Sequence, residues 1–187
     1  MYNKCQNRIE KHIQLVHQQK DEIKKKSLIF SNYFLNCTKR NKRIFIAGNG
    51  GSASDAQHLN TELQIRYKKN RRPFPSIALT ADTALITACS NDLSFDQIFS
   101  RQIESLGRKG DIFLGISTSG NSKNIIDAFK IAKKKKLLTL GILGNKGGLC
   151  KKYCKNTFIV DSSEISLVQE LHLIFYHQIC ENFEKVY

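Results

Sequence analysis

The chain has 187 residues, which fits one domain with a substantial core and is too short for two comfortable ones. With 41% hydrophobic and 25% charged residues, and no apolar run near the ~18 residues that span a bilayer, the composition indicates a soluble globular protein without a membrane partner. The N-terminus also lacks the apolar core of a signal peptide, so we expect a cytoplasmic protein.

The charge is strongly positive, with 30 Lys and Arg against 16 Asp and Glu, a net charge of +14. Such a charge attracts nucleic acids, anionic lipids or phosphorylated metabolites, and does not by itself distinguish them. The basic residues gather at 24–26, 39–43, 68–72 and 133–136, without interleaved aromatic residues that would stack on bases. We therefore favour a solvated basic surface over a nucleic-acid face, and predict no nucleic-acid partner.

The cysteines form neither a CxxC pair nor a cluster with zinc-finger spacing. The six are Cys5, Cys37, Cys89, Cys150, Cys154 and Cys180. We predict reduced thiols, and a structural role for the one close pair, Cys150 and Cys154.

The first predicted element is an amphipathic helix over residues 6–36. Its apolar residues recur at roughly helical spacing, at Ile9, Ile13, Val16, Ile23, Phe30 and Phe34. We expect residues 1–40 to form a helical arm that precedes an α/β core of residues 43–187 and packs on a neighbouring subunit.

Five short runs rich in Ile, Leu, Val and Phe predict buried strands at residues 43–47, 76–80, 111–117, 138–143 and 157–160. Helical stretches lie between them, which indicates a parallel sheet covered on both faces. The predicted fold class is therefore α/β, a three-layer sandwich with a five-stranded parallel sheet, in one domain over residues 1–187.

The first strand runs into a glycine-rich loop, IAGNGGSASD at residues 46–55, which opens the next helix. The glycine spacing is not GxGxxG, and no acidic residue ends a strand about 20 residues later, so a dinucleotide site is disfavoured. His58 and Glu62 lie four residues apart on one face of this helix. Such a pair either binds a metal or shares a proton, or is an ordinary surface pair.

The third strand runs into a second loop, LGISTSGNS at residues 114–122, which also opens a helix. Ser117, Thr118, Ser119 and Ser122 each offer an O–H, and Gly120 lets the backbone approach a ligand closely. With the amides of the helix start, they would suit a phosphate monoester, although a plain Ser/Gly-rich turn would have the same residues. Both loops follow parallel strands and would face one crevice, so we predict a small phosphorylated ligand.

Four motifs, in this order, resemble the phosphoheptose isomerase family of the SIS sugar-isomerase superfamily. They are GNGGSA…DAQH…E…RY at 48–67, SND at 90–92, GISTSGNS at 115–122 and VQELH…H at 168–177. The resemblance runs from about Gly48 to the C-terminus. It implies a flavodoxin-like SIS fold and a homotetramer with active sites between subunits. It also implies conversion of sedoheptulose 7-phosphate to D-glycero-D-manno-heptose 7-phosphate, for ADP- or GDP-heptose precursors of lipopolysaccharide or capsule.

Interconversion of a ketose and an aldose moves a proton between C1 and C2 through an enediol, which needs an acid and a base. Glu62 and His177 are the candidates, because a carboxylate and an imidazole exchange these roles near neutral pH. The resemblance further implies a divalent ion, zinc, ligated by His58, Glu62, Gln169 and His177. The substrate contacts that it implies are Asn49, Gly50, Gly51, Ser52, Glu62, Arg66, Asn91, Asp92, Ser117, Thr118, Ser119, Ser122 and Gln169.

The last predicted helix, residues 166–184, carries Gln169, His172 and His177. Gln169 and His177 lie eight residues apart, about 12 Å along a straight helix, so we expect a neighbouring subunit to supply some site residues. His172 is expected to pack in the core. Where many relatives have an Arg two residues before the glutamine this chain has Leu167, and Ser166 stands where some have an acid.

Two other functions are open to a protein with this fold and with the two loops at residues 46–55 and 114–122. A non-enzymatic SIS paralogue that associates with a replication initiator would lack the glutamate and the final histidine, and both Glu62 and His177 are present here. A sugar-phosphate-binding regulator would need a DNA-binding domain, and the ~40 residues before the first strand leave no room for a helix-turn-helix module.

Overall fold

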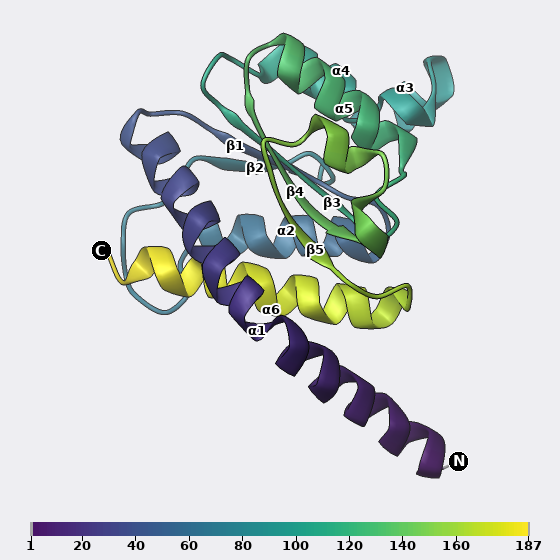
Figure 1. Ribbon diagram of the computed structural model, residues 1–187. Helices are drawn as coiled ribbons and strands as arrows, with labels where there is room; N and C mark the ends of the chain where they lie inside the picture. Colours follow the sequence, from purple (N-terminus) through teal and green to yellow (C-terminus); the bar gives the residue numbers. More distant parts are fainter. Residues whose placement is uncertain (1, 187) are drawn as a thin grey trace.

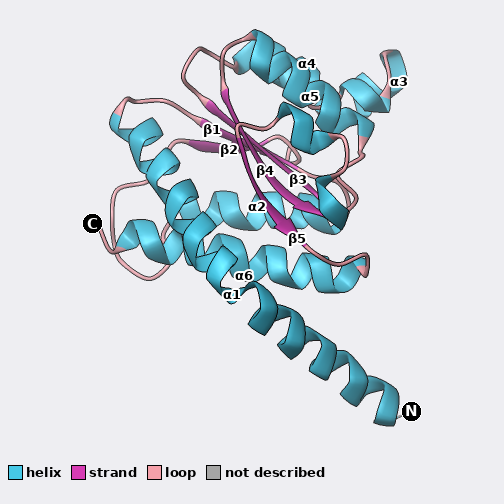
Figure 2. Cartoon of the chain, viewed as in Figure 1, coloured by secondary structure: helices cyan, strands magenta, loops and turns pink. Residues whose placement is uncertain are grey.

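The centre of the protein is a single parallel sheet (Figures 1 and 2). The computed structural model describes residues 2–186, and side chains from Asn7 onward. The strands are β1 (Ile44–Ala47), β2 (Ser76–Ala78), β3 (Ile112–Ser117), β4 (Leu138–Gly144) and β5 (Asn156–Val160). They pair in the order β2-β1-β3-β4-β5, and every neighbouring pair is parallel. The five predicted strands are confirmed, with β2 two residues shorter than predicted.

Helices cover both faces of the sheet, so the three-layer prediction is confirmed. On one face lie α1 (Tyr2–Lys39), α2 (Gly51–Gln64) and α6 (Ile165–Glu184). On the other lie α3 (Thr83–Asp92), α4 (Ser100–Leu106) and α5 (Lys123–Lys134), with the short 3-10 turns η1 (Phe95–Gln97) and η3 (Cys150–Tyr153). A further 3-10 turn, η2 (Asn145–Gly147), follows β4. Alternate strand residues serve the two layers: Ile44 and Ile46 pack toward α2 and α6, and Phe45 toward α4 and α5.

The N-terminal arm packs mainly on its own chain. The C-terminal half of α1 lies across α6 (Figure 1), where Phe30 and Phe34 are fully buried and the Phe30 ring meets Phe175 edge to face at 5.3 Å. The expectation that the arm packs on a neighbour is therefore wrong for this half, because α6 offers an apolar surface within the chain. The N-terminal half projects beyond the sheet, with Ile9 and Ile13 62% and 61% exposed.

The five cysteines with described side chains are free, in agreement with the prediction of reduced thiols. Burial raises the pKa of Cys150 to about 12, and does the same for Cys37 with a contribution from the charge of Asp111. Such thiols are poor nucleophiles. The side chain of Cys5 lies outside the described residues. None of the helices within residues 2–186 combines the length and the apolar character needed to span a membrane.

Candidate active site

The loops after β1 and β3 lie next to each other, because these two strands are neighbours in the sheet. Side-chain amides join them: Asn49 and Asn124 each donate Nδ2–H to the other's Oδ1, at 2.9 Å in both directions. Asn49 belongs to the first loop, and Asn124 lies in the first turn of α5, which follows the second loop. The pair therefore fixes the start of α5 against the loop after β1.

The second loop folds into a polar cradle at the start of α5. Ser117, buried at the end of β3, accepts the N–H of Gly120 at 3.1 Å, and its Oγ lies 3.1 Å from the Oγ of Ser122. Gly120 has φ +65°, and a Cβ there would collide with the Gly147 carbonyl, so glycine is required. Ser119 is exposed at the loop tip. Hydroxyls and helix amides thus gather where an anion would be stabilised.

The first loop opens α2, which runs alongside α6. The side-chain amide of Gln169 lies against Gly51, so closely that a Cβ at Gly51 would collide with it. His58 lies seven residues further along α2, about 10 Å by helical rise. Gln169 therefore meets the beginning of α2, while the predicted ionisable residues lie toward its end.

Three ionisable side chains converge near the end of α2. The Nε2 of His58 lies 3.1 Å from the Oε1 of Glu62, and the His58 and His177 rings meet at 5.1 Å between centroids. The ring of Tyr67 lies 5.4 Å from that of His177. Burial lowers the pKa of His177, and the charges of His58 and Lys68 outweigh the opposing effect of Glu62. His177 is therefore neutral at neutral pH and has a lone pair to offer.

The same cluster has the donors of a divalent-cation site. One ligand atom from each of His58, Glu62 and His177 lies within 4.8 Å of the others, compared with about 3.3 Å between the ligands of a tetrahedral zinc ion. Two imidazoles and a carboxylate suit zinc. The structure thus brings together three of the four predicted ligands. Gln169 is separated from them along an uninterrupted α6.

Two further residues support the cluster, and neither was singled out from the sequence. The Tyr176 hydroxyl lies 3.0 Å from His58 Nδ1 and donates to Asp55 Oδ1 at 3.3 Å. Tyr176 is fully buried. Burial raises the pKa of Asp55 to about 6, although the hydrogen bond from Tyr176 and the charge of His58 act to lower it. Two features of the sequence could have pointed to these residues. Asp55 lies one helical turn before His58, and Tyr176 is adjacent to His177.

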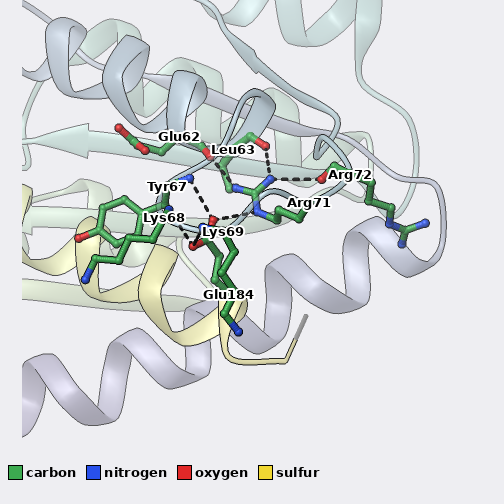
Figure 3. A network of polar contacts seen from close by, with 8 residues as sticks. All are labelled: Glu62, Leu63, Tyr67, Lys68, Lys69, Arg71, Arg72 and Glu184. Atoms are coloured by element: carbon green, nitrogen blue, oxygen red, sulfur yellow. Dashed lines mark hydrogen bonds and ion pairs between the residues drawn. The ribbon is translucent and has the colours of Figure 1, made fainter.

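A buried ion pair fixes the chain segment that follows α2 (Figure 3). Glu184, at the end of α6, accepts the backbone N–H groups of Tyr67, Lys68 and Lys69 at 2.9–3.0 Å. It also accepts from Arg71 Nε at 3.1 Å, and both side chains of this pair are almost fully buried.

Arg71 in turn caps the end of α2. Its guanidinium donates to the carbonyls of Glu62 at 2.6 Å and Leu63 at 3.0 Å (Figure 3). These carbonyls lie in the last turn of the helix, where partners within the helix are lacking. The backbone of the candidate catalytic residue Glu62 is therefore tied to Glu184 through Arg71.

Three other predicted site residues are not bonded to this cluster. Asn91 and Asp92 end α3, are exposed and hydrogen-bond each other at 2.9 Å, while Arg66 is exposed just beyond α2. In the described part of the chain, none of these three makes a hydrogen bond or ion pair to His58, Glu62 or His177. His172 is fully buried, and burial lowers its pKa to about 4 against an opposing contribution from the Leu143 backbone. A neutral ring packed in the core accords with its expected role.

The fold and the hydroxyl loop define a SIS domain protein, and residues 3–144 match the SIS domain family. The phosphoheptose isomerase of Campylobacter concisus is 48% identical over 149 residues, which cover 80% of this chain and 79% of that protein. The structure of a phosphoheptose isomerase from Francisella tularensis aligns with a TM-score of 0.91 at 29% identity, covering 99% of this chain and 98% of that one. The corresponding structure from Neisseria gonorrhoeae gives 0.91 at 31% identity, covering 97% and 98%.

These similarities confirm the resemblance read from the four motifs. The chain belongs to the phosphoheptose isomerase family of SIS domain proteins, a family of enzymes.

Proposed function

We propose that this enzyme converts sedoheptulose 7-phosphate to D-glycero-D-manno-heptose 7-phosphate, a step toward nucleotide-activated heptose for lipopolysaccharide or capsule. The observation that supports the proposal is the convergence of His58, Glu62 and His177 near the end of α2. The loop that opens α2 is joined to the start of α5, directly after the hydroxyl loop, through Asn49 and Asn124. An acid-base cluster and an anion cradle are the two components that an isomerase of phosphorylated sugars requires.

The cradle after β3 would hold the phosphate. Ser117, Thr118, Ser119 and Ser122 supply hydroxyls, and the amides at the start of α5 add N–H donors and the positive end of the helix dipole. Asn49, Gly50, Gly51, Ser52, Arg66, Asn91, Asp92 and Gln169 are the remaining proposed substrate contacts.

Glu62 and His177 would carry the proton transfer. One of them removes a proton from C1 of the ketose while the C2 carbonyl oxygen takes up a proton, which gives the enediol. The other then returns a proton to C2 while the C1 hydroxyl loses its own, which leaves the aldehyde and balances the reaction without a redox partner. The lowered pKa of His177 keeps its ring neutral and able to accept a proton.

We further propose a divalent ion, zinc, held by His58, Glu62 and His177, with Gln169 as the fourth ligand expected from the family. When bound, such an ion polarises the O1/O2 oxygens. A glutamate held by a metal is a weaker base, so the ion would have a partly structural or regulatory role. Because Gln169 lies at the other end of the α2/α6 contact, a neighbouring subunit would help complete the site.

The proposed assembly is a cytoplasmic homotetramer with active sites between subunits. The projecting half of α1 supports it, because Ile9 and Ile13 are largely exposed in the single chain. Apolar side chains on one face of a projecting helix favour contact with another subunit.

The presence of Glu62 and His177 in one cluster favours the isomerase over a non-enzymatic SIS paralogue or a sugar-phosphate-binding regulator. The direct test incubates the purified protein with sedoheptulose 7-phosphate and follows formation of the aldoheptose phosphate by NMR or mass spectrometry. Fructose 6-phosphate, a ketose phosphate one carbon shorter, serves as the control substrate. Absence of turnover with sedoheptulose 7-phosphate in the zinc-loaded protein would refute the proposal.

A further inference from the structure

The hydroxyl of Tyr176 is placed to control which nitrogen of His58 carries a proton. It lies between two groups of α2, 3.3 Å from Asp55 Oδ1 and 3.0 Å from His58 Nδ1. Tyr176 itself comes from α6 and is fully buried, so packing fixes the position of its ring. The other nitrogen of His58, Nε2, faces Glu62 at 3.1 Å.

The hydrogen-bonding capacities of these groups determine which group donates and which accepts in the series His58, Tyr176 and Asp55. A carboxylate only accepts hydrogen bonds, so the single O–H of Tyr176 is used toward Asp55. The tyrosine oxygen then offers only lone pairs to His58, and Nδ1 must carry the hydrogen that joins them. In a neutral imidazole with Nδ1 protonated, Nε2 has a free lone pair.

That lone pair points at the Glu62 carboxylate, another electron-rich group. Two such atoms 3.1 Å apart require a cation between or beside them, either a proton or a metal ion. The ring of His177 closes the same space from α6. The arrangement of the three side chains is thus suited to a cation held by Nε2 of His58.

We propose that Tyr176, oriented by Asp55, is a positioning residue that holds His58 in the Nδ1–H tautomer and presents Nε2 to a divalent cation. This inference rests on the proposed metal site and adds the residues that prepare it. Groups that hydrogen-bond a ligating histidine fix its tautomer and ring orientation, and their removal typically lowers metal affinity about 10- to 100-fold.

The test measures Zn²⁺ affinity by competition with a chromophoric chelator, for wild type and for Tyr176→Phe, which keeps the ring and removes the hydroxyl. We expect a 10- to 100-fold weaker affinity for the variant. Tyr153→Phe removes a tyrosine hydroxyl on the opposite face of the sheet and should bind as wild type does. Thermal unfolding of the zinc-free proteins at equal concentration checks that Tyr176→Phe is folded.

A second variant tests whether Asp55 acts through Tyr176. Asp55→Asn should weaken binding by itself, whereas the double variant Asp55→Asn/Tyr176→Phe should bind no more weakly than Tyr176→Phe alone, because the hydroxyl linking Asp55 to His58 is already gone. In ¹⁵N spectra of the five histidines, wild-type His58 should show a protonated Nδ1, and this state should be lost or mixed in Tyr176→Phe.

The zinc affinities of wild type and Tyr176→Phe distinguish failure of the positioning role from failure of the proposed metal site. If wild type binds zinc and Tyr176→Phe binds it equally well, the positioning role is wrong and the proposed metal site stands. If wild type binds no zinc, the proposed metal site is wrong, and the inference fails with it. If the losses of zinc affinity in Asp55→Asn and Tyr176→Phe add fully in the double variant, Asp55 does not act on His58 through Tyr176.

Discussion

Replacing Glu184 by glutamine should strongly destabilise the protein, because both carboxylate oxygens serve two donors each. Oε1 accepts from the backbone of Tyr67 and from Arg71, and Oε2 accepts from the backbones of Lys68 and Lys69. Whichever way a glutamine amide is turned, its NH₂ group faces two donors. The substitution therefore removes two hydrogen bonds and leaves a buried guanidinium without its counter-charge.

The size of the effect follows from the burial of the pair. The side chains of Arg71 and Glu184 are 2% and 4% exposed, and removing one partner of such a pair costs about 3–5 kcal/mol. For a domain of this size, that loss lowers the melting temperature by roughly 6–20 °C. Glu181→Gln is the matched control. It lies on the same helix and pairs with Lys68 at 3.3 Å, but both side chains are 40% or more exposed, so the expected loss is below about 1 kcal/mol.

The assay is urea unfolding followed by circular dichroism, at fixed protein concentration so that subunit association contributes equally.

The stabilisation that Glu184 contributes should depend on pH. Burial by itself would raise the pKa of Glu184, but the backbone N–H groups of Lys69, Lys68 and Tyr67, together with Arg71, lower it below the ordinary value of 4.5. The stabilisation is therefore present at neutral pH and is lost as the pH falls through the folded-state pKa.

The difference between wild type and Glu184→Gln should consequently be largest near neutral pH and shrink in acid. If Glu184→Gln loses no more stability than Glu181→Gln at pH 7, the ion pair does not stabilise the end of α2 in the way that its geometry indicates. A difference that stays constant down to acid pH would show that the charge of Glu184 is not the cause.

The remaining predictions concern the proposed site. Glu62→Gln and His177→Ala should each lower kcat by at least ~10²-fold with the fold intact by circular dichroism, and near-normal turnover in both would refute their acid-base roles. Ser119→Ala and Ser122→Ala should raise KM for the sugar phosphate more than they lower kcat, because a phosphate remote from C1 and C2 is held about equally in the ground and transition states. A loss confined to kcat would contradict this role. Light scattering should show an oligomer that Ile13→Asp weakens, and a fully active wild-type monomer at micromolar concentration would exclude shared sites.

Elements whose signals are local could be predicted from the amino-acid sequence alone. Five contiguous apolar runs became the five parallel strands, because a strand buried on both faces needs apolar residues throughout. The hydroxyl loop at 114–122 and the i, i+4 pair His58 and Glu62 were also readable, since each depends on residues within one or two turns of the chain. Four motifs in order sufficed to indicate the phosphoheptose isomerase family, to which the chain belongs.

Contacts between residues far apart in the chain depend on how the helices and strands pack, and could not be predicted in this way. The packing of α1 on α6 could not be read from the arm, because an amphipathic face does not specify which apolar surface covers it. The partners of Glu184 lie more than 110 residues earlier in the chain, and Tyr176 meets His58 from 118 residues away. Buried polar groups are satisfied wherever folding places a donor and an acceptor together, and no local pattern records that pairing.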